Sequence, residues 1–521
     1  MSLRYPIGEQ DFPSLREDGM VYVDKTSHIY RLLSSGGKYF FLSRPRRFGK
    51  SLLVSTLKAL FEGRKSLFDG LWIYDKWDWS KRHPVVHISL DATSYRQDGL
   101  EKALSGLIKR QALLHGIAIA ETSAGTQLEE LIFQLYRQTG QRVVVLIDEY
   151  DKALLDFLDD PVVLADHQQV LQGFYGVLKP ASPYLEFVFL TGVSKFAKVS
   201  VFSSLNNLED ITFSPDFVDG VGITEAELQT YFRDRLQELA TQKGMSYDAW
   251  LAQVRYWYNG YSWDGTTRVY NPFSTLSFLK RGQFSNYWIE TGVPSSVVRR
   301  MVEEKHEVDL ELVEVGQDFF EGTSIYELPI RTLLFQAGFL TVKSVTEDGL
   351  YQIGYPNEEV RQAMYLHLLN WFQGGERAGL SSPVVVRMAR HFEANALEEV
   401  VSGINTIFSG IPYNLFIADQ ERYYHAVLFI VFQLLSINTR VEVHCAGGRT
   451  DMVVQTQSHT YILEFKLNES AEAALAQIHA KGYAVPYLHQ GRSVVAVGIN
   501  FDGTKKQVGD WKQERLSIKK G

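Results

Sequence analysis

Residues 44 to 51 read Arg-Pro-Arg-Arg-Phe-Gly-Lys-Ser, and no other segment constrains the fold of this chain as strongly. The segment ends as a phosphate-binding loop of the form G-x-x-x-x-G-K-[ST] ends, but Arg44 stands where that pattern has its first glycine. In such loops the last glycine lets backbone N–H groups approach phosphate oxygens. The lysine places a charge on the terminal phosphates, and the hydroxyl binds Mg²⁺. Gly49, Lys50 and Ser51 therefore predict a nucleotide site in an α/β domain.

The departure from the pattern lies in the first half of the loop. Arg44 lacks the freedom that glycine has at positive φ, and Pro45 offers no N–H group to a phosphate. Arg46 and Arg47 can supply guanidinium contacts instead, or they can face solvent or a partner. We expect ATP to bind along this loop, including Phe48, whereas rapid hydrolysis is left open.

Short apolar runs alternate with helical patterns over residues 1–215, as in an α/β domain with a parallel sheet. The expected buried strands are Tyr39–Ser43, Val85–Leu90, Val143–Ile147 and Phe187–Thr191. The third of these strands is followed by Asp148 and Glu149, which fall at its carboxyl end, where open sheets bind ligands. We expect Asp148 to hold Mg²⁺ through water and Glu149 to position or activate the attacking water.

Two further pairs of residues near this sheet are weaker candidates. Thr191 and Ser194 could sense the γ-phosphate, or they could simply be a polar strand end. Asp24 and Lys25 could flank the adenine, although an ordinary helix cap explains this segment equally well.

The bulk properties bound the class of protein. A chain of 521 residues predicts roughly three or four domains. Its single cysteine, Cys445, excludes an internal disulfide framework, and the net charge of -8 gives no overall attraction to nucleic acid. The N-terminus shows no signal peptide, and the longest apolar run, from His425 to Ile437, is too short to span a bilayer. We therefore expect a soluble, cytoplasmic protein without a membrane partner.

The middle of the chain predicts two connecting modules. Residues 216–300 read as a mainly helical lid, with a helix capped at Thr224. Residues 301–378 suggest a winged-helix-like connector, because a helix at Ile330–Leu340 is followed by a hairpin at Thr341–Ile353 and a helix at Glu358–Trp371.

Residues 379–521 predict a second α/β domain. A helix from about Ala418 to Leu435 precedes several strands, and another helix, Ala471–Tyr483, is inserted before the last of them. The expected strands are Arg440–His444, Asp451–Thr456, Tyr461–Phe465 and Val494–Ile499.

Asp451 and the triplet Glu464-Phe465-Lys466 form the second chemical pattern. Because strand side chains alternate, Glu464 and Lys466 point to one side, and Asp451 begins the neighbouring strand. Two carboxylates can then share one hydrated Mg²⁺, and Lys466 can orient its water or stabilise negative charge. The alternative is an exposed hairpin with a surface Glu–Lys pair.

Residues on both flanking helices could extend this site. Gln477 and Tyr483 could line the same cleft, and Glu421 could be a further metal contact one turn from His425. His425 is more readily explained as a packed or capping histidine than as a catalyst. Glu442 and the basic residues of the tail, such as Lys505, are better explained as solvent-facing.

At these residues the chain resembles a bacterial family of AAA-ATPase-like proteins with a C-terminal PD-(D/E)XK nuclease domain. The resemblance covers nearly the whole chain and includes Pro6-Ile7-Gly8, Tyr22-Val23-Asp24-Lys25-Thr26, RPRRFGKS, LIDEYD, WYNGY, Tyr270-Asn271-Pro272, GRTD and EFK. The family's loop also typically lacks the first glycine. The resemblance implies an ATP-binding core, a helical and winged-helix connector and a nuclease-like fold. Asp451, Glu464 and Lys466 match its nuclease motif residue by residue, and Gln477 matches more loosely.

Together these features predict an ATP-regulated, Mg²⁺-dependent nuclease that is both an ATPase and a phosphodiester hydrolase. Its expected partner is a nucleic acid, with DNA favoured over RNA, and homo-oligomerisation is left open. The alternative is a nucleotide-switched regulatory or nucleic-acid-binding protein whose nuclease fold is inert. A third hypothesis is an ATPase whose C-terminal domain only recognises a partner.

Overall fold

The computed structural model describes residues 4–92, 95–195, 201–202, 205, 207–288, 312–321, 329–372, 381–411, 421–435, 438–445 and 448–517. The side chains of residues 92, 321, 381–382, 421–423, 438–445 and 448–449 lie outside this description. The chain divides into two compact units, Met1–Arg361 and Gln362–Gly521, and each is described by itself. The domain boundaries expected near residues 215, 300 and 378 stay predictions.

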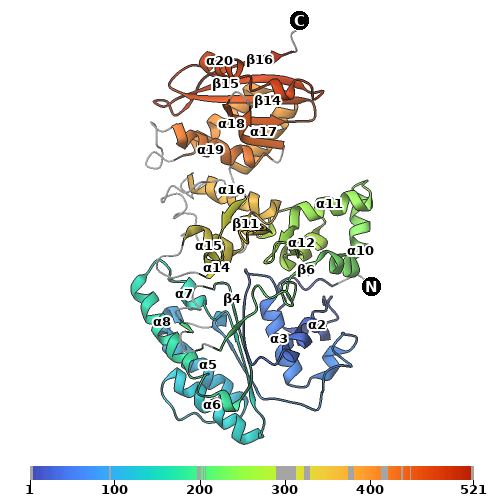
Figure 1. Cartoon of the computed structure of the whole chain (residues 1–521), viewed down its shortest axis with the longest axis vertical. Coiled ribbons are helices and arrows are strands. Elements are labelled where there is room, and N and C mark those ends of the chain that lie inside the picture. Colours follow the sequence, from blue (N-terminus) through green and yellow to red (C-terminus); the bar gives the residue numbers. More distant parts are fainter. Residues whose placement is uncertain are drawn as a thin grey trace. The chain divides into compact units, whose positions relative to one another are not determined.

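A five-stranded parallel sheet forms the centre of the first unit, as the sequence predicts. Its strands follow the order β2-β3-β4-β1-β5. Figure 1 shows α5, α6 and α8 on one side of these strands and α2 and α3 on the other. The elements are α1 (Phe12–Glu17), α2 (Thr26–Ser34), β1 (Tyr39–Ser43), α3 (Lys50–Phe61), β2 (Val85–Ser89), α4 (Tyr95–Asp98), α5 (Leu100–Leu114), α6 (Ala124–Thr139), β3 (Val143–Asp148), α7 (Lys152–Leu155), α8 (Pro161–Gly176), β4 (Leu185–Gly192) and β5 (Glu209–Asp210).

The strand order sets the spacing of the candidate residues. β4 lies between β1, which leads into the phosphate loop, and β3, which ends in Asp148. With neighbouring strands about 4.8 Å apart, the two strand ends are separated by roughly 10 Å. Ser43 is level with Gly192, and Ser89 is level with Asp148, so the carboxyl ends of the strands meet at one edge.

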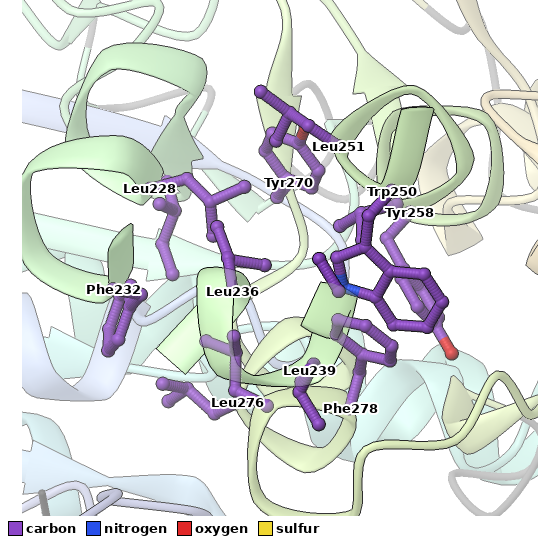
Figure 2. Packing of buried hydrophobic residues seen from close by; sticks show 14 of the residues in the cluster. Leu228, Phe232, Leu236, Leu239, Trp250, Leu251, Tyr258, Tyr270, Leu276 and Phe278 are labelled. Atoms are coloured by element: carbon purple, nitrogen blue, oxygen red, sulfur yellow. The ribbon is translucent and has the colours of Figure 1, made fainter. Parts of the chain in front are cut away.

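Three helices then pack around an apolar cluster, shown in Figure 2. α10 (Glu225–Gln242) begins at Thr224 in a capping box with Glu227, as its sequence predicts. α10 contributes Leu228, Phe232 and Leu236 at a spacing of four residues, which places them on one face. α11 (Tyr247–Tyr258) and α12 (Pro272–Arg281) complete the cluster, and β6 (Ile223–Thr224), β7 (Asn259–Tyr261) and β8 (Val269–Tyr270) form a small sheet beside it.

The last part of the first unit contains the expected hairpin. β10 (Thr341–Val345) and β11 (Tyr351–Gly354) pair antiparallel, and β9 (Val313–Val315) adds to β11. α14 (Asp318–Glu321) and α15 (Ile330–Ala337) precede the hairpin, and α16 (Glu358–Phe372), which continues into the second unit, follows it.

The second unit is built on a mixed sheet in the order β12-β13-β14-β15-β16. Only β14 and β15 run parallel, because α20 crosses over between them. The predicted helix–strand pattern is confirmed, whereas α17, α18 and β16 were not predicted. The elements are α17 (Ser381–Glu393), α18 (Leu397–Ser409), α19 (Glu421–Gln433), β12 (Asn438–Cys445), β13 (Gly448–Gln455), β14 (His459–Leu467), α20 (Ala471–Lys481), β15 (Ser493–Asp502) and β16 (Gln507–Leu516). Within the described ranges, none of the helices has the length and apolar character needed to cross a membrane.

Candidate functional site

The phosphate loop takes its unusual backbone geometry at Arg47 and Gly49, not at Arg44. The φ angles of these two residues are 66° and 91°, and Gly49 caps the N-terminus of α3. The residue that replaces the first glycine therefore does not need glycine's conformational freedom here.

Arg44 is instead a buried cross-link beneath the loop. Its guanidinium donates to the backbone oxygens of Ser43 at 2.9 Å and Thr212 at 2.8 Å, and it lies 3.8 Å from the ring centre of Trp263. Burial lowers the pKa of Arg44 to about 9, and Asp210 opposes this shift. The side chain therefore ties the loop to the segment after β5 and to the aromatic segment after β7.

A pocket of about 440 Å³ opens over the phosphate loop. Its volume is that of a typical small-molecule site. It brings together six of the predicted residues, Arg46, Arg47, Gly49, Lys50, Ser51 and Glu149. The remaining lining comes from residues that the sequence analysis did not single out for this site: Pro6, Gly8, Glu9, Gln10, Leu52, Asp91, Lys152, Pro272, Phe273 and Leu276.

An apolar pocket of about 90 Å³ lies next to it. Pro6, Gly49, Leu52, Pro272 and Leu276 line both spaces, so the two pockets are neighbours along the loop. Phe48 and Lys25 line only the apolar pocket. The Lys25 ammonium is bound by Glu227 at 2.7 Å, and Asp24 accepts a hydrogen bond from the backbone N–H of Thr26, the first residue of α2, at 2.8 Å.

Lys50 is buried and folded back onto its own loop. Its ammonium donates to the backbone oxygens of Arg44 at 3.0 Å and Pro45 at 3.1 Å. Burial lowers the pKa of Lys50, while Glu149 and Asp148 act in the opposite direction. The Lys50 ammonium is thus hydrogen-bonded to two backbone carbonyl groups, and a phosphate can take their place as its partner.

Glu149 and Asp148 lie at the carboxyl end of β3. Glu149 has a φ of 53°, and burial raises its pKa to about 7, with Lys50 opposing the rise. Asp148 is buried and accepts a hydrogen bond from the backbone N–H of Glu149 at 3.0 Å. A carboxyl group with a pKa near neutrality is suited to proton transfer.

The two polar residues at the end of β4 do not line the pocket. The Thr191 hydroxyl donates to the backbone oxygen of Leu42 at 2.8 Å and is fully buried. Ser194 donates to Asp151, which also accepts from the backbone N–H of Val193 at 3.2 Å. Asp151 was not predicted. Asp151 fixes the end of β4 against the end of β3. Its partners lie more than 40 residues away in the sequence, so no local motif indicates this role.

The second predicted group assembles on β13 and β14. The backbone N–H of Phe465 donates to Asp451 at 2.8 Å, and the backbone N–H of Asp451 lies 3.4 Å from a Glu464 carboxylate oxygen. The Lys466 ammonium lies 3.9 Å from Glu464, whose side chain is only 2% exposed. Burial, followed by the charge of Asp451, raises the pKa of Glu464 to about 7.

Both flanking helices reach this group. On α20, the Gln477 side-chain amide donates to Glu464 and lies 3.5 Å from the Tyr483 hydroxyl. On α19, the His425 ring nitrogen Nδ1 is 4.0 Å from Asp451. The side chains of Glu421 and Glu442 lie outside the described residues. Among the side chains that are described, no group of three or more His, Cys, Asp or Glu residues is arranged to hold a metal ion.

Comparisons with known proteins match two separate parts of the chain to two families. Residues 6–202 match a family described as a predicted AAA-ATPase, and residues 419–511 match the PD-(D/E)XK nuclease superfamily. A protein of Azotobacter chroococcum mcd 1, named an uncharacterized protein in the vnfD 5′ region, is 37% identical over 524 residues. That alignment covers 97% of this chain and 98% of the relative. The chain thus belongs to the family of AAA-ATPase-like proteins that carry a C-terminal domain of the PD-(D/E)XK nuclease superfamily.

Proposed function

We propose that this protein is a Mg²⁺-dependent nuclease whose cutting of nucleic acid, preferentially DNA, is controlled by ATP. The observation that carries the proposal is the grouping of Asp451, Glu464, Lys466 and Gln477 on adjoining elements of the second unit. The same chain contains a formed pocket around a phosphate loop.

In the proposed ATP site, Gly49, Lys50 and Ser51 bind the phosphates, and the apolar pocket beside Phe48 receives the base. The lining of that apolar pocket supports this assignment, because it includes Phe48 and Gly49 of the phosphate loop. Asp148 and Ser51 provide oxygen ligands for Mg²⁺, and Glu149 accepts a proton from the attacking water. Thr191 has no part in this proposal, because its hydroxyl is bound within the sheet.

The donor set of the second site suits a hard divalent cation. Asp451 and Glu464 offer carboxylate oxygens, and the pKa of Glu464 is raised first by burial and then by the charge of Asp451, both of which a bound cation would offset. Bound there, Mg²⁺ would lower the pKa of a coordinated water and polarise the phosphodiester. Lys466 would stabilise the negative charge that develops on the phosphate, and Gln477 would hold Glu464 in place.

A cleavage assay with Mg²⁺ on double-stranded DNA, single-stranded DNA and RNA tests the proposal, with ATP, ADP or no nucleotide. We expect the parent to cut at least one substrate and Lys466→Ala to cut none. We expect Lys50→Ala to lose the dependence on nucleotide. Lys481→Ala, an exposed lysine on α20, is the matched control and should behave as the parent does.

Cleavage that survives Lys466→Ala would contradict the proposed site. If the parent binds ATP and Mg²⁺ yet cuts no substrate, the alternative of an inert nuclease fold in a nucleotide-switched protein is favoured instead.

A further inference from the structure

The phosphate pocket contains a second lysine, Lys152, which the proposed ATP chemistry does not yet use. We propose that Lys152 is a further catalytic residue that contacts the terminal phosphate of ATP and stabilises its charge during hydrolysis. This inference rests on the proposed ATP site.

Lys152 reaches the pocket from a different strand end than Lys50 does. It begins α7, and its backbone N–H donates to the backbone oxygen of Glu149 at 3.0 Å. Lys50 follows β1 and Lys152 follows β3, with β4 between these two strands. Lys50 and Lys152 therefore line one pocket from two different strand ends, and a terminal phosphate held by Lys50 would lie toward Glu149 and Lys152.

The Lys152 side chain is held at the rim of the pocket by two carboxylates. Its ammonium lies 3.2 Å from Asp156 and 3.8 Å from Asp91, and the side chain is 21% exposed. Asp91 also lines the pocket and is largely exposed, so this pair can open without leaving a buried charge. The ammonium can then turn toward a phosphate.

Asp156 does not depend on Lys152 for a partner. Arg96 lies 2.9 Å from Asp156, and the Tyr95 hydroxyl donates to the same carboxylate at 2.5 Å. These contacts hold Asp156 from outside the pocket, so its carboxylate keeps two partners when the Lys152 ammonium turns toward a phosphate.

The chemical role of the lysine follows from the hydrolysis step. Water attacks the γ-phosphorus and gives a proton to Glu149, while the bond from that phosphorus to the bridging oxygen breaks. The electron pair of that bond remains on the β-phosphate. Lys152 transfers no proton, and its charge offsets the negative charge on the γ-phosphate oxygens.

The test compares ATP turnover and nucleotide affinity in the full chain. We expect Lys152→Ala to lower kcat on the order of 100-fold, with ADP affinity unchanged, because ADP lacks the phosphate that Lys152 contacts. Lys152→Arg should restore part of the rate. Lys102→Ala is the matched control, since this lysine forms a similar i,i+4 pair with Asp98 on the surface.

Asp156→Asn separates catalysis from a role in folding. If Lys152 only pairs with Asp156, this variant will reproduce the whole defect and overturn the inference. Turnover at the parent rate in Lys152→Ala overturns it as well.

A second case is a parent that binds ATP more tightly than ADP without hydrolysing it. In that case Lys152→Ala must lose the preference for ATP over ADP, and an unchanged preference overturns the inference. If the parent binds neither nucleotide, the proposed ATP site itself fails.

Discussion

The Asp451 carboxylate accepts a hydrogen bond from the backbone N–H of Phe465 at 2.8 Å, across the two strands that carry the candidate nuclease residues. Phe465 lies between Glu464 and Lys466, so the strand that supplies these two side chains also orients Asp451. One backbone contact thus couples the position of one carboxylate to that of the other. Such coupling is what a shared metal ion requires of its ligands.

Asp451→Asn is expected to abolish Mg²⁺ binding at this site while leaving the fold intact. An asparagine oxygen can still accept from the Phe465 N–H, but the negative charge that attracts the cation is lost. Calorimetric titration with Mg²⁺, in a Lys50→Ala background that removes the nucleotide site, measures the effect. Glu472→Gln, an exposed carboxylate on α20, is the control and should titrate as the background does. Retained Mg²⁺ binding in Asp451→Asn would assign the ion to other residues.

Gln477→Ala is expected to lower nuclease turnover by roughly 10- to 100-fold without unfolding the domain. Its amide holds one oxygen of Glu464, and without it the carboxylate is free to rotate away from Asp451. Cleavage rates measured over a range of Mg²⁺ concentrations check this, because weaker metal binding shifts the concentration needed for half-maximal rate. His479→Ala, on the same helix but paired with Glu514 near the surface, should leave both quantities unchanged.

The sequence predicted the parts of both sites that lie within short motifs. Lys50, Ser51 and Glu149 follow buried strands, so the carboxyl edge of a parallel sheet brings them together, and Asp451 meets Glu464 by hairpin pairing alone. Lys152 was not predicted, because its position in the pocket depends on strand order.

Other features depend equally on contacts between distant residues. The function of Arg44 rests on Thr212 and Trp263, which follow it by more than 160 residues. β16 was not predicted because most of its residues are exposed, which removes the apolar alternation that identifies a strand.

Arg44→Gly is expected to destabilise the first unit, although it restores the usual glycine of the loop. The change removes the guanidinium from Ser43 and Thr212, leaving buried carbonyl groups without a donor, and it removes the contact with Trp263. We expect a loss of about 3 kcal/mol, or roughly 5–10 °C in Tm. Thermal unfolding measures it, with Arg46→Gly at the pocket surface as the matched control. A Tm equal to that of the parent would show that Arg44 does not stabilise the loop.

Glu359→Gln is expected to make the first unit less sensitive to pH. Burial raises the pKa of Glu359 to about 8, and its carboxylate accepts from the backbone N–H of Trp288 at 2.9 Å. Because the unfolded carboxyl ionises near its ordinary pKa of 4.5, the folded state holds an extra proton between pH 4.5 and about 8. The stability of the parent should therefore fall as pH rises through this window, by on the order of 1 kcal/mol per pH unit, and level off above it.

Glutamine keeps the acceptor for Trp288 and cannot ionise. The Tm of Glu359→Gln minus that of the parent should therefore increase from pH 5 to about pH 8 and then stay constant. Glu347→Gln, in the exposed turn between β10 and β11, should show no such trend. A constant difference across the whole range for Glu359→Gln would mean that this carboxyl is ionised in the folded protein, with its charge matched by a partner.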